Sequence, residues 1–268
     1  MTRHIHPLLI LAISLLGVCP QAATARDSNS LMDISTDGRL LACSNRDSGT
    51  VTIVDLKTLK TIHETRVGTH PEGVAFLGQS HRLAVAIYND DQTAVLDADT
   101  GKLIHRVDVF DEPYGIVSNR DGSRYYVTLE FPGTIAEISD TGDVLRQFPA
   151  GKFPRGLALT PDGKTLYTSE YYTAQVNAID VASGKIVDSW TGSSTDNLCR
   201  QIVLHPTRPK AYIPHIRSRI VAAQGEGSIF PYVGVVDTKK GEGRRRKRIP
   251  MDSFLGNLVT ANPWEIDV

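Results

Sequence analysis

Charged and aromatic residues recur directly after a proline at intervals of about 42 residues. Glu72, Tyr114 and Arg155 follow Pro71, Pro113 and Pro154, whose positions are 42 and 41 residues apart. Aligning two later copies of the same stretch adds Arg200 and Trp264. A guanidinium group is planar, permanently charged and offers paired donors, which suits a carboxylate or phosphate. The first candidate site is therefore this column, and its expected ligand is a small anion or an anionic group of a protein partner. The column comprises Glu72, Tyr114, Arg155, Arg200 and Trp264.

A second column of candidates lies at the end of the next predicted strand. Asn45, Glu170 and His215 align there, while two other copies hold Ile87 and Leu129. His215 also opens the stretch 215–230, a predicted insertion that contains Arg217 and Arg219 and could contact a redox partner or a propionate-bearing cofactor. Long loops on rigid scaffolds often carry function. The plainer interpretation is that both columns are solvated loop ends and that the insertion packs on a missing repeat or domain.

Motifs for catalysis, metal binding and haem attachment are missing from the sequence. It contains no GxSxG, HExxH, phosphate-loop or EF-hand pattern, and no CxxC or CxxCH. We therefore predict no metal and no cofactor, and favour a non-catalytic protein. A lactonase-like activity stays open, because such sites use scattered loop residues. Asp55, Asp97 and Asp180 recur once per repeat, as expected of side chains that cap turns.

The repeat itself predicts the fold. PEGVAFLGQSHRLAVAIY, PYGIVSNRDGSRYYVTLE and PRGLALTPDGKTLYTSEY begin at Pro71, Pro113 and Pro154, and each is followed by a shorter strand, an aspartate and a second turn. Short strands rich in β-branched and aromatic residues, separated by Gly, Asp and Pro turns at this period, are typical of β-propeller blades. We expect an all-β chain with four-stranded blades at about 29–70, 71–112, 113–153, 154–197 and 198–261, and a partial blade at 262–268.

The N-terminus has the features of a secretory signal peptide over residues 1–25. Basic residues precede an apolar run from Leu8 to Val18, and Ala23-Thr24-Ala25 supplies small residues for cleavage. A lipoprotein interpretation would use Cys19. The expected location is periplasmic or extracellular, with no membrane span and no affinity for nucleic acid, since the net charge is −1. Cleavage leaves Cys43 and Cys199, which we expect to be buried and unpaired.

One basic run, GRRRKR from Gly243 to Arg248, departs from this even charge distribution. Such a run can indicate nucleic-acid binding or nuclear targeting, which an exported protein makes unlikely. We expect a solvated hairpin tip between the last two strands of the fifth blade, with docking to an acidic partner as the alternative.

These repeats resemble the YVTN-repeat, YncE-like family of exported seven-bladed propellers, related to lactonase-like and methylamine-dehydrogenase-heavy-chain-like propellers. The segments DNLCRQIVLHPTRPKAYIPHIRSR, GSIFPYVGVVD and ANPWE further resemble the propeller part of proteins in which a MauG-like dihaem peroxidase domain follows. The resemblance implies a binding or scaffolding module, or the propeller of a redox enzyme with a haem-bearing partner. The CxxCH motifs of the fusion proteins are absent from this sequence.

The number of repeats leads to a further expectation. Seven blades would need about 294 residues at this period, more than the 268 of the chain. We expect an incomplete seven-bladed ring; a five-bladed ring closed by the strand at 262–268 is the alternative.

Overall fold

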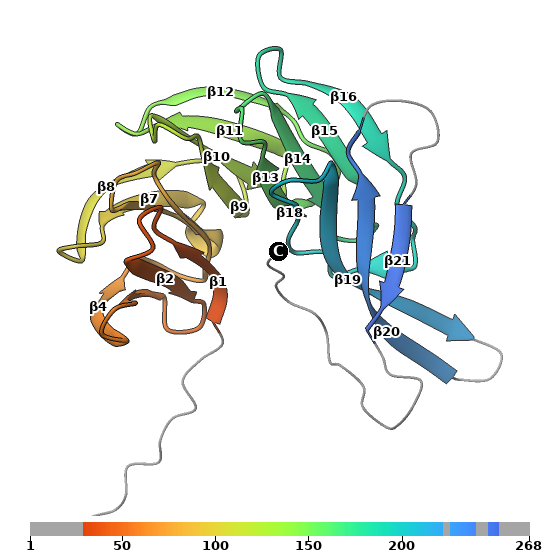
Figure 1. Ribbon diagram of the computed structural model, residues 1–268, viewed down its shortest axis with the longest axis horizontal. Helices are drawn as coiled ribbons and strands as arrows, with labels where there is room; N and C mark the ends of the chain where they lie inside the picture. The colour runs from red at the N-terminus through yellow and green to blue at the C-terminus, as the bar shows by residue number, and fades with distance from the viewer. Residues whose placement is uncertain (1–28, 222–225, 240–245, 252–268) are drawn as a thin grey trace, which may run out of the picture.

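Five antiparallel sheets make up the described part of the chain, which is residues 29–221, 226–239 and 246–251 of the computed structural model. They fan out in an arc, with the sheet of β1 at one end and that of β19–β21 at the other (Figure 1). Each sheet is one propeller blade, and the innermost strand of each faces the middle of the arc. The predicted all-β propeller with four-stranded blades is confirmed. The described residues form five blades, and a seven-bladed ring is not shown. The partial blade predicted at 262–268 lies outside the described residues.

The first four blades have the same strand order as the sequence. Their strands are β1 (Asn29–Ile34), β2 (Leu40–Asn45), β3 (Thr50–Asp55) and β4 (Lys60–Arg66); β5 (Pro71–Phe76), β6 (Arg82–Ile87), β7 (Gln92–Asp97) and β8 (Lys102–Asp108); β9 (Pro113–Ser118), β10 (Arg124–Leu129), β11 (Thr134–Ser139) and β12 (Val144–Pro149); β13 (Pro154–Leu159), β14 (Thr165–Glu170), β15 (Val176–Asp180) and β16 (Lys185–Trp190). A single 3₁₀ turn, η1 (Tyr88–Asp90), follows β6.

Blade five departs from this pattern. Two short strands, β17 (Asp196–Asn197) and β18 (Val203–Leu204), both pair with β19 (Lys210–Val221), which continues the sheet through β20 (Glu226–Asp237) and β21 (Arg246–Pro250). The predicted loop insertion at 215–230 is wrong for most of its length. β19 and β20 pair continuously from Lys210 opposite Asp237 to Val221 opposite Glu226, so the extra residues lengthen a hairpin.

Four hydrophobic clusters hold neighbouring blades together, one at each junction. Between blades one and two, for example, Leu40 and Ile53 pack against Leu83 and Leu96, all fully buried. Alternating residues of a strand point to opposite faces, so each blade presents one apolar face to the blade before it and another to the blade after it. Burial on both faces explains why the sequences of the inner strands, such as β5 and β6, are nearly continuous apolar runs.

The glycine of each proline-x-glycine motif has a specific packing role. A side chain on Gly73 would overlap the backbone carbonyl oxygen of Tyr114, and one on Gly115 would overlap that of Arg155. Gly156 has the same relation to the backbone at Gln201 and Ile202. The innermost strands of successive blades therefore approach so closely that only glycine fits.

The residue before each blade-opening position adopts a left-handed conformation. His70, Glu112 and Phe153, which precede the three prolines, have φ values of 55°, 59° and 47°, and Leu198 has 57°. Left-handed backbone costs a non-glycine residue on the order of 1–2 kcal/mol, so the blade packing must hold it in place. This repeated bend lies two residues before each of Glu72, Tyr114, Arg155 and Arg200.

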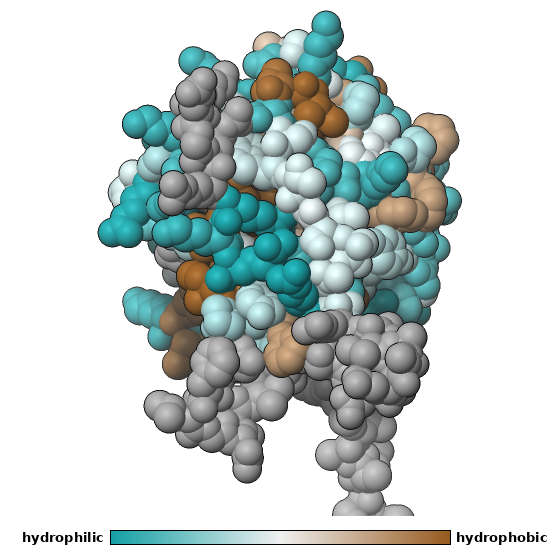
Figure 2. Space-filling model, turned by 90° about the vertical axis from the view of Figure 1, so that its right-hand side faces the viewer, coloured by the Kyte–Doolittle hydropathy of each residue, from teal (hydrophilic) through white to brown (hydrophobic). Residues whose placement is uncertain are grey.

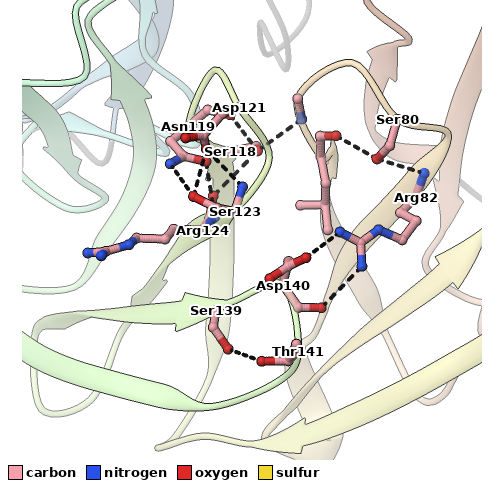
Figure 3. Close-up of polar contacts among 12 residues, drawn as sticks. Ser80, Arg82, Ser118, Asn119, Asp121, Ser123, Arg124, Ser139, Asp140 and Thr141 are labelled. Atoms are coloured by element: carbon pink, nitrogen blue, oxygen red, sulfur yellow. Dashed lines mark hydrogen bonds and ion pairs between the residues drawn. The ribbon is translucent and has the colours of Figure 1, made fainter.

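Polar contacts join the blades at the opposite end of the inner strands. Arg82 of blade two bonds Asp140 of blade three, with 2.6 Å from Nη2 to Oδ2, and the backbone N–H of Gly78 donates to Ser118 Oγ (Figure 3). Within the turn of blade three, Asp121 accepts from Ser123, as expected of an aspartate-glycine hairpin. The predicted aspartate-glycine turns are present, with positive φ at Gly38, Gly122 and Gly163.

Cys43 and Cys199 are buried, as predicted, with 6% and 0% exposed, and neither forms a disulfide bond within the described residues. No helix in the described ranges has the length and apolar character to cross a membrane. The predicted signal peptide at 1–25 lies outside those ranges.

Candidate functional site

A cavity of about 580 Å³ lies along the inner strands of the five blades. Its wall consists of backbone and side chains of β1, β5, β9, β13 and the segment around β18. Arg155 and Arg200 line the end at which the inner strands begin, and Arg120 lines the turn end. Asp33 is the acidic residue in this lining. The charged lining is therefore mainly cationic, which favours an anionic ligand.

Arg155, of the predicted first column, contacts a carboxylate and two aromatic rings. Its Nε donates to Glu130 Oε1, and its guanidinium carbon lies 4.5 Å from the ring centroid of Tyr114 and 3.8 Å from that of Tyr171. Only 14% of the side chain is exposed. Cation–π contacts are strongest where water is excluded, as it is here. The charge of Arg155 is largely engaged within the protein.

Arg200 shares the contact with Tyr171. Its Nη2 donates to the hydroxyl of Tyr171 at 3.3 Å, and its guanidinium carbon lies 5.4 Å from that ring. Tyr171 therefore lies between two arginines, Arg155 and Arg200. Arg200, like Arg155, is one of the residues that line the cavity.

The other described members of the first column are buried between blades. Glu72 is 2% exposed and forms a salt bridge with Arg46 of blade one, with 3.1 Å from Nε to Oε1. Tyr114 is 1% exposed and meets Tyr88 edge to face, with 6.2 Å between ring centroids. Neither lines the cavity. Trp264, the fifth predicted member, lies outside the described residues.

The residues that complete this arrangement form a column that the sequence analysis missed by one position. Arg46, Tyr88, Glu130 and Tyr171 each come directly after the second strand of a blade, one residue beyond the predicted column. Each contacts the first-column residue of the next blade: Arg46 contacts Glu72, Tyr88 contacts Tyr114, Glu130 contacts Arg155, and Tyr171 contacts Arg200. The shift arises because side chains on a strand alternate between faces, so the last residue of the strand points away from this contact. We call these eight residues the mouth ring.

Burial and charge in the mouth ring change the proton affinities of its members. Burial raises the pKa of Tyr114, and the nearby Glu72 raises it further. Burial also raises the pKa of Glu130, although Arg155 opposes this effect. Burial alone would lower the pKa of Arg155, but Glu130 keeps it above the ordinary value. Tyr114 therefore stays neutral and Arg155 stays charged at neutral pH.

Asp33 stands apart as a titratable group in the cavity wall. Burial raises its pKa to about 6, even though the backbone N–H groups of Phe76 and Ile34 donate to it. Its protonation therefore changes the charge of the cavity in a mildly acidic range.

The predicted second column has structural partners in the described residues. The Asn45 amide donates to Thr50 and Thr52. Glu170 accepts the backbone N–H of Lys152 at 2.9 Å and the hydroxyl of Thr173 at 2.7 Å, so it fixes the loop that delivers Arg155.

His215 and Arg217 contact a different group. His215 is fully buried, with Nε2 4.0 Å from Asp196 Oδ1, and Arg217 Nε lies 3.9 Å from the same oxygen. Arg219 lies in β19 opposite Ser228, and nothing further is described of its side chain. The predicted solvated tip at Gly243–Arg248 is wrong for its second half. Arg246 and Arg248 belong to β21, and both approach Asp196.

No cluster of three or more His, Cys, Asp or Glu side chains suited to a metal ion occurs in the described residues.

The fold defines the chain as a β-propeller, and its central cavity has a mainly cationic lining. The chain is similar to Kuenenia stuttgartiensis hydrazine synthase, with a TM-score of 0.79 and 26% identity over 91% of this chain and 72% of that one. It is also similar to the Swd1 β-propeller domain of Myceliophteria thermophila (TM-score 0.59, 13% identity, 84% and 86% of the two chains). A chain of the mitotic checkpoint complex gives a TM-score of 0.65 at 13% identity over 82% and 64%. The last two show the fold alone. No protein-family model and no curated protein matches the chain.

Proposed function

We propose that this chain is an exported β-propeller of the YVTN-repeat type that binds an anionic ligand, or an anionic group of a periplasmic protein, in its central cavity. The observation that supports the proposal is the mainly cationic charge of the cavity lining, to which Arg120, Arg155 and Arg200 contribute. In this proposal Arg155 is held by Glu130 and packs against the rings of Tyr114 and Tyr171. Arg200 supplies the positive charge that binds the ligand. A planar guanidinium binds carboxylate or phosphate in a forked geometry.

Titration calorimetry with succinate tests this proposal. Arg200→Gln keeps a polar side chain of similar shape but removes the charge, and we expect it to weaken succinate binding about tenfold or more. The control is Arg106→Gln, because Arg106 is an exposed arginine on β8 whose Nη1 donates to Gln92. Equal affinity in wild type and Arg200→Gln, or no succinate binding at all, would contradict the proposed site. Arg155 is unsuitable for this test, because its removal leaves Glu130 buried without its partner.

Export is tested separately by mass spectrometry of the mature protein from a periplasmic fraction. An N-terminus at Arg26 is the expected result, and a retained Met1 would contradict it.

A second candidate function is that of the propeller part of a redox enzyme. It is supported by the similarity to hydrazine synthase over 91% of this chain. In this case the chain works with a haem-bearing partner polypeptide. An optical titration with a dihaem c-type cytochrome would show a saturable change in the haem spectrum, whereas an unchanged spectrum together with succinate binding favours the free-standing binding protein. A panel of lactones assayed for hydrolysis tests the remaining enzymatic alternative.

A further inference from the structure

A buried ionic cluster lies between blades four and five, apart from the mouth ring. We call it the junction cluster: Asp196, His215, Arg217, Arg246 and Arg248. Asp196 is the first residue of β17 and is fully buried. Arg248 donates to Asp196 Oδ2 from both Nε, at 3.0 Å, and Nη2. Arg246 Nη2 lies 3.7 Å from the same oxygen.

The sheet register brings these side chains to one face of blade five. Gly234 of β20 lies opposite Arg248 of β21 and Ile213 of β19, so the long side chain of Arg248 crosses the sheet over a residue without a side chain. A Cβ on Gly234 would lie 3.2 Å from His215 Cε1 and 3.6 Å from Arg246 Nη2. Glycine at this position therefore leaves the room in which the cluster assembles.

The cluster carries more positive than negative charge. Three guanidinium groups, those of Arg217, Arg246 and Arg248, face the single carboxylate of Asp196. Burial lowers the pKa of Arg246, and Arg248 lowers it further, while Asp196 opposes both. His215 adds no further positive charge, because burial lowers its pKa and keeps the ring neutral at neutral pH. Like charges at close range are costly without a counter-ion.

Several buried polar atoms of the cluster have no hydrogen-bond partner within the described part of the chain. On the donor side these are Nε and Nη2 of Arg246, whose side chain is only 9% exposed. On the acceptor side they are Asp196 Oδ1 and His215 Nε2. His215 Nδ1 is 3.1 Å from the carbonyl oxygen of Ile213, which can only accept, so Nδ1 holds the proton and Nε2 of the neutral ring is an acceptor. Leaving such groups unsatisfied in a protein interior is unfavourable.

A ligand that satisfies these atoms must accept hydrogen bonds from Arg246 and donate one to Asp196 or His215. A fully ionised oxyanion such as sulfate would satisfy Arg246 but would be repelled by Asp196 Oδ1, since it has no proton to give. Monohydrogen phosphate carries oxyanion acceptors for the guanidinium groups and an O–H donor for Asp196 or His215. We propose that the junction cluster is a binding site for free monohydrogen phosphate.

Access to the site comes from the side of Arg217 and Arg248. Their side chains are 43% and 28% exposed, whereas Arg246 and His215 lie deeper. Figure 2, which looks onto this end of the arc, shows a hydrophilic area over the surface. A phosphate group entering between the two outer arginines would bring its counter-charge to the inner one.

The experiment measures the thermal midpoint of unfolding of the full mature chain against inorganic phosphate, sulfate and glycerol 3-phosphate, at pH 7.5 and constant ionic strength. A ligand that binds only the native state raises the midpoint in a saturable manner. We expect phosphate to reach half-saturation at a concentration about tenfold or more below that of sulfate, because a site with buried acceptors rejects a ligand lacking the O–H. The phosphate group of glycerol 3-phosphate is almost wholly dianionic at this pH and has no O–H, so this ester should behave like sulfate. Stabilisation by the ester at the concentrations at which phosphate acts would contradict the proposed role of the O–H.

Matched variants assign the effect to the junction cluster. Arg246→Gln and Arg217→Gln should each abolish or strongly weaken the phosphate effect, and Arg217, being partly exposed, can be replaced with little risk to folding. Arg106→Gln and Arg200→Gln should retain it. A phosphate effect equal to that of sulfate, or one that survives in both junction variants, would overturn the proposal. Loss in Arg200→Gln alone would also overturn it and would assign phosphate to the central cavity.

Discussion

Arg155 donates a hydrogen bond from Nε to the carboxylate of Glu130, the residue that follows the second strand of the preceding blade. On its own blade, the same guanidinium lies 3.8 Å from the ring centroid of Tyr171. The pair is buried, with side chains 14% and 3% exposed, and it joins blades three and four at the mouth of the cavity. An ion pair in this position holds Arg155 against the ring of Tyr171, which Arg200 also contacts.

Breaking this pair on one side should destabilise the protein strongly. Glu130→Gln leaves Arg155 buried without its counter-ion, and we expect a loss of about 3–5 kcal/mol in the free energy of unfolding. The double variant with Arg155→Gln should lose less than the sum of the two single variants, because neither charge is then left alone. Urea unfolding of the four proteins measures the coupling. The comparison pair is Arg39 and Asp99, which are 50% and 43% exposed and should contribute at most about 1 kcal/mol. Additive losses at Glu130 and Arg155 would show that the pair is not coupled.

Replacing the motif glycine of blade three should disturb the junction with blade four. In Gly115→Ala the new Cβ would overlap the carbonyl oxygen of Arg155, which belongs to the backbone and cannot move by a rotamer change. We expect a loss of about 2–3 kcal/mol from this overpacking. Gly38→Ala is the control: Gly38 has φ +70° but nothing within 4 Å of its Cβ position, so only about 1 kcal/mol of backbone strain is expected. Chemical denaturation compares the two, and equal losses would mean that the close approach is not rigid.

The contact between blades one and two should depend on pH through His81. Its Nδ1 is 2.7 Å from Asp99 Oδ2 and its Nε2 is 3.1 Å from Asp37 Oδ2. Asp99 and then Asp37 raise the pKa of His81, so folding favours the protonated ring. Its contribution to stability is therefore fully present below the unfolded pKa of about 6.5 and is lost as the pH rises through the folded pKa.

The measurement is urea unfolding at several pH values between 5.5 and 8.5, in wild type and His81→Gln. The wild type should lose stability relative to the variant as the pH rises. Asp37, whose pKa the hydroxyl of Ser35, the backbone N–H of Arg39 and His81 lower to about 2, stays ionised over this range. A constant difference between the two proteins would contradict the assignment to His81.

Cys199 should be inert in the native state. It is fully buried, and burial raises the pKa of its thiol to about 12, so the reactive thiolate is scarce at pH 8. Labelling with a thiol reagent should be slow in buffer and rapid in denaturant. The variant Cys43→Ser isolates Cys199 for this assay, and rapid native-state labelling would mean that the junction of blades four and five opens readily.

The architecture could be predicted from the sequence because the repeat marks the same positions in every blade. The prolines at 71, 113 and 154 do begin inner strands, and the aspartate-glycine pairs do form tight turns. Of the candidate site, the sequence predicted the first column but not the residues that contact it. Strand alignment located Arg155, but its partners Glu130 and Tyr171 come from a column whose chemistry differs in every blade. The first column could be placed because it follows a recurring proline, whereas no recurring residue precedes the partner column, and strand alignment therefore fell one position short of it.

Blade five shows a different limit. The stretch 215–230 has no turn residues until its Gly-rich end, which could have indicated a continuous strand. The basic run ending at Arg248 pairs with Asp196, which lies 52 residues earlier in the sequence. Only the register of β19, β20 and β21 brings these residues together, and register is set by the paired hairpin rather than by any local motif.

The contact between Tyr88 and Arg155 has a consequence for how the array unfolds. Most of the contacts described join adjacent blades, and a linear array coupled only between nearest neighbours can lose one terminal repeat at a time. Arg155 Nη2, however, donates to the Tyr88 hydroxyl at 3.5 Å, which links blade four to blade two across blade three. This second-neighbour coupling should make blades two to four melt as one cooperative unit, with fraying confined to the first and fifth repeats.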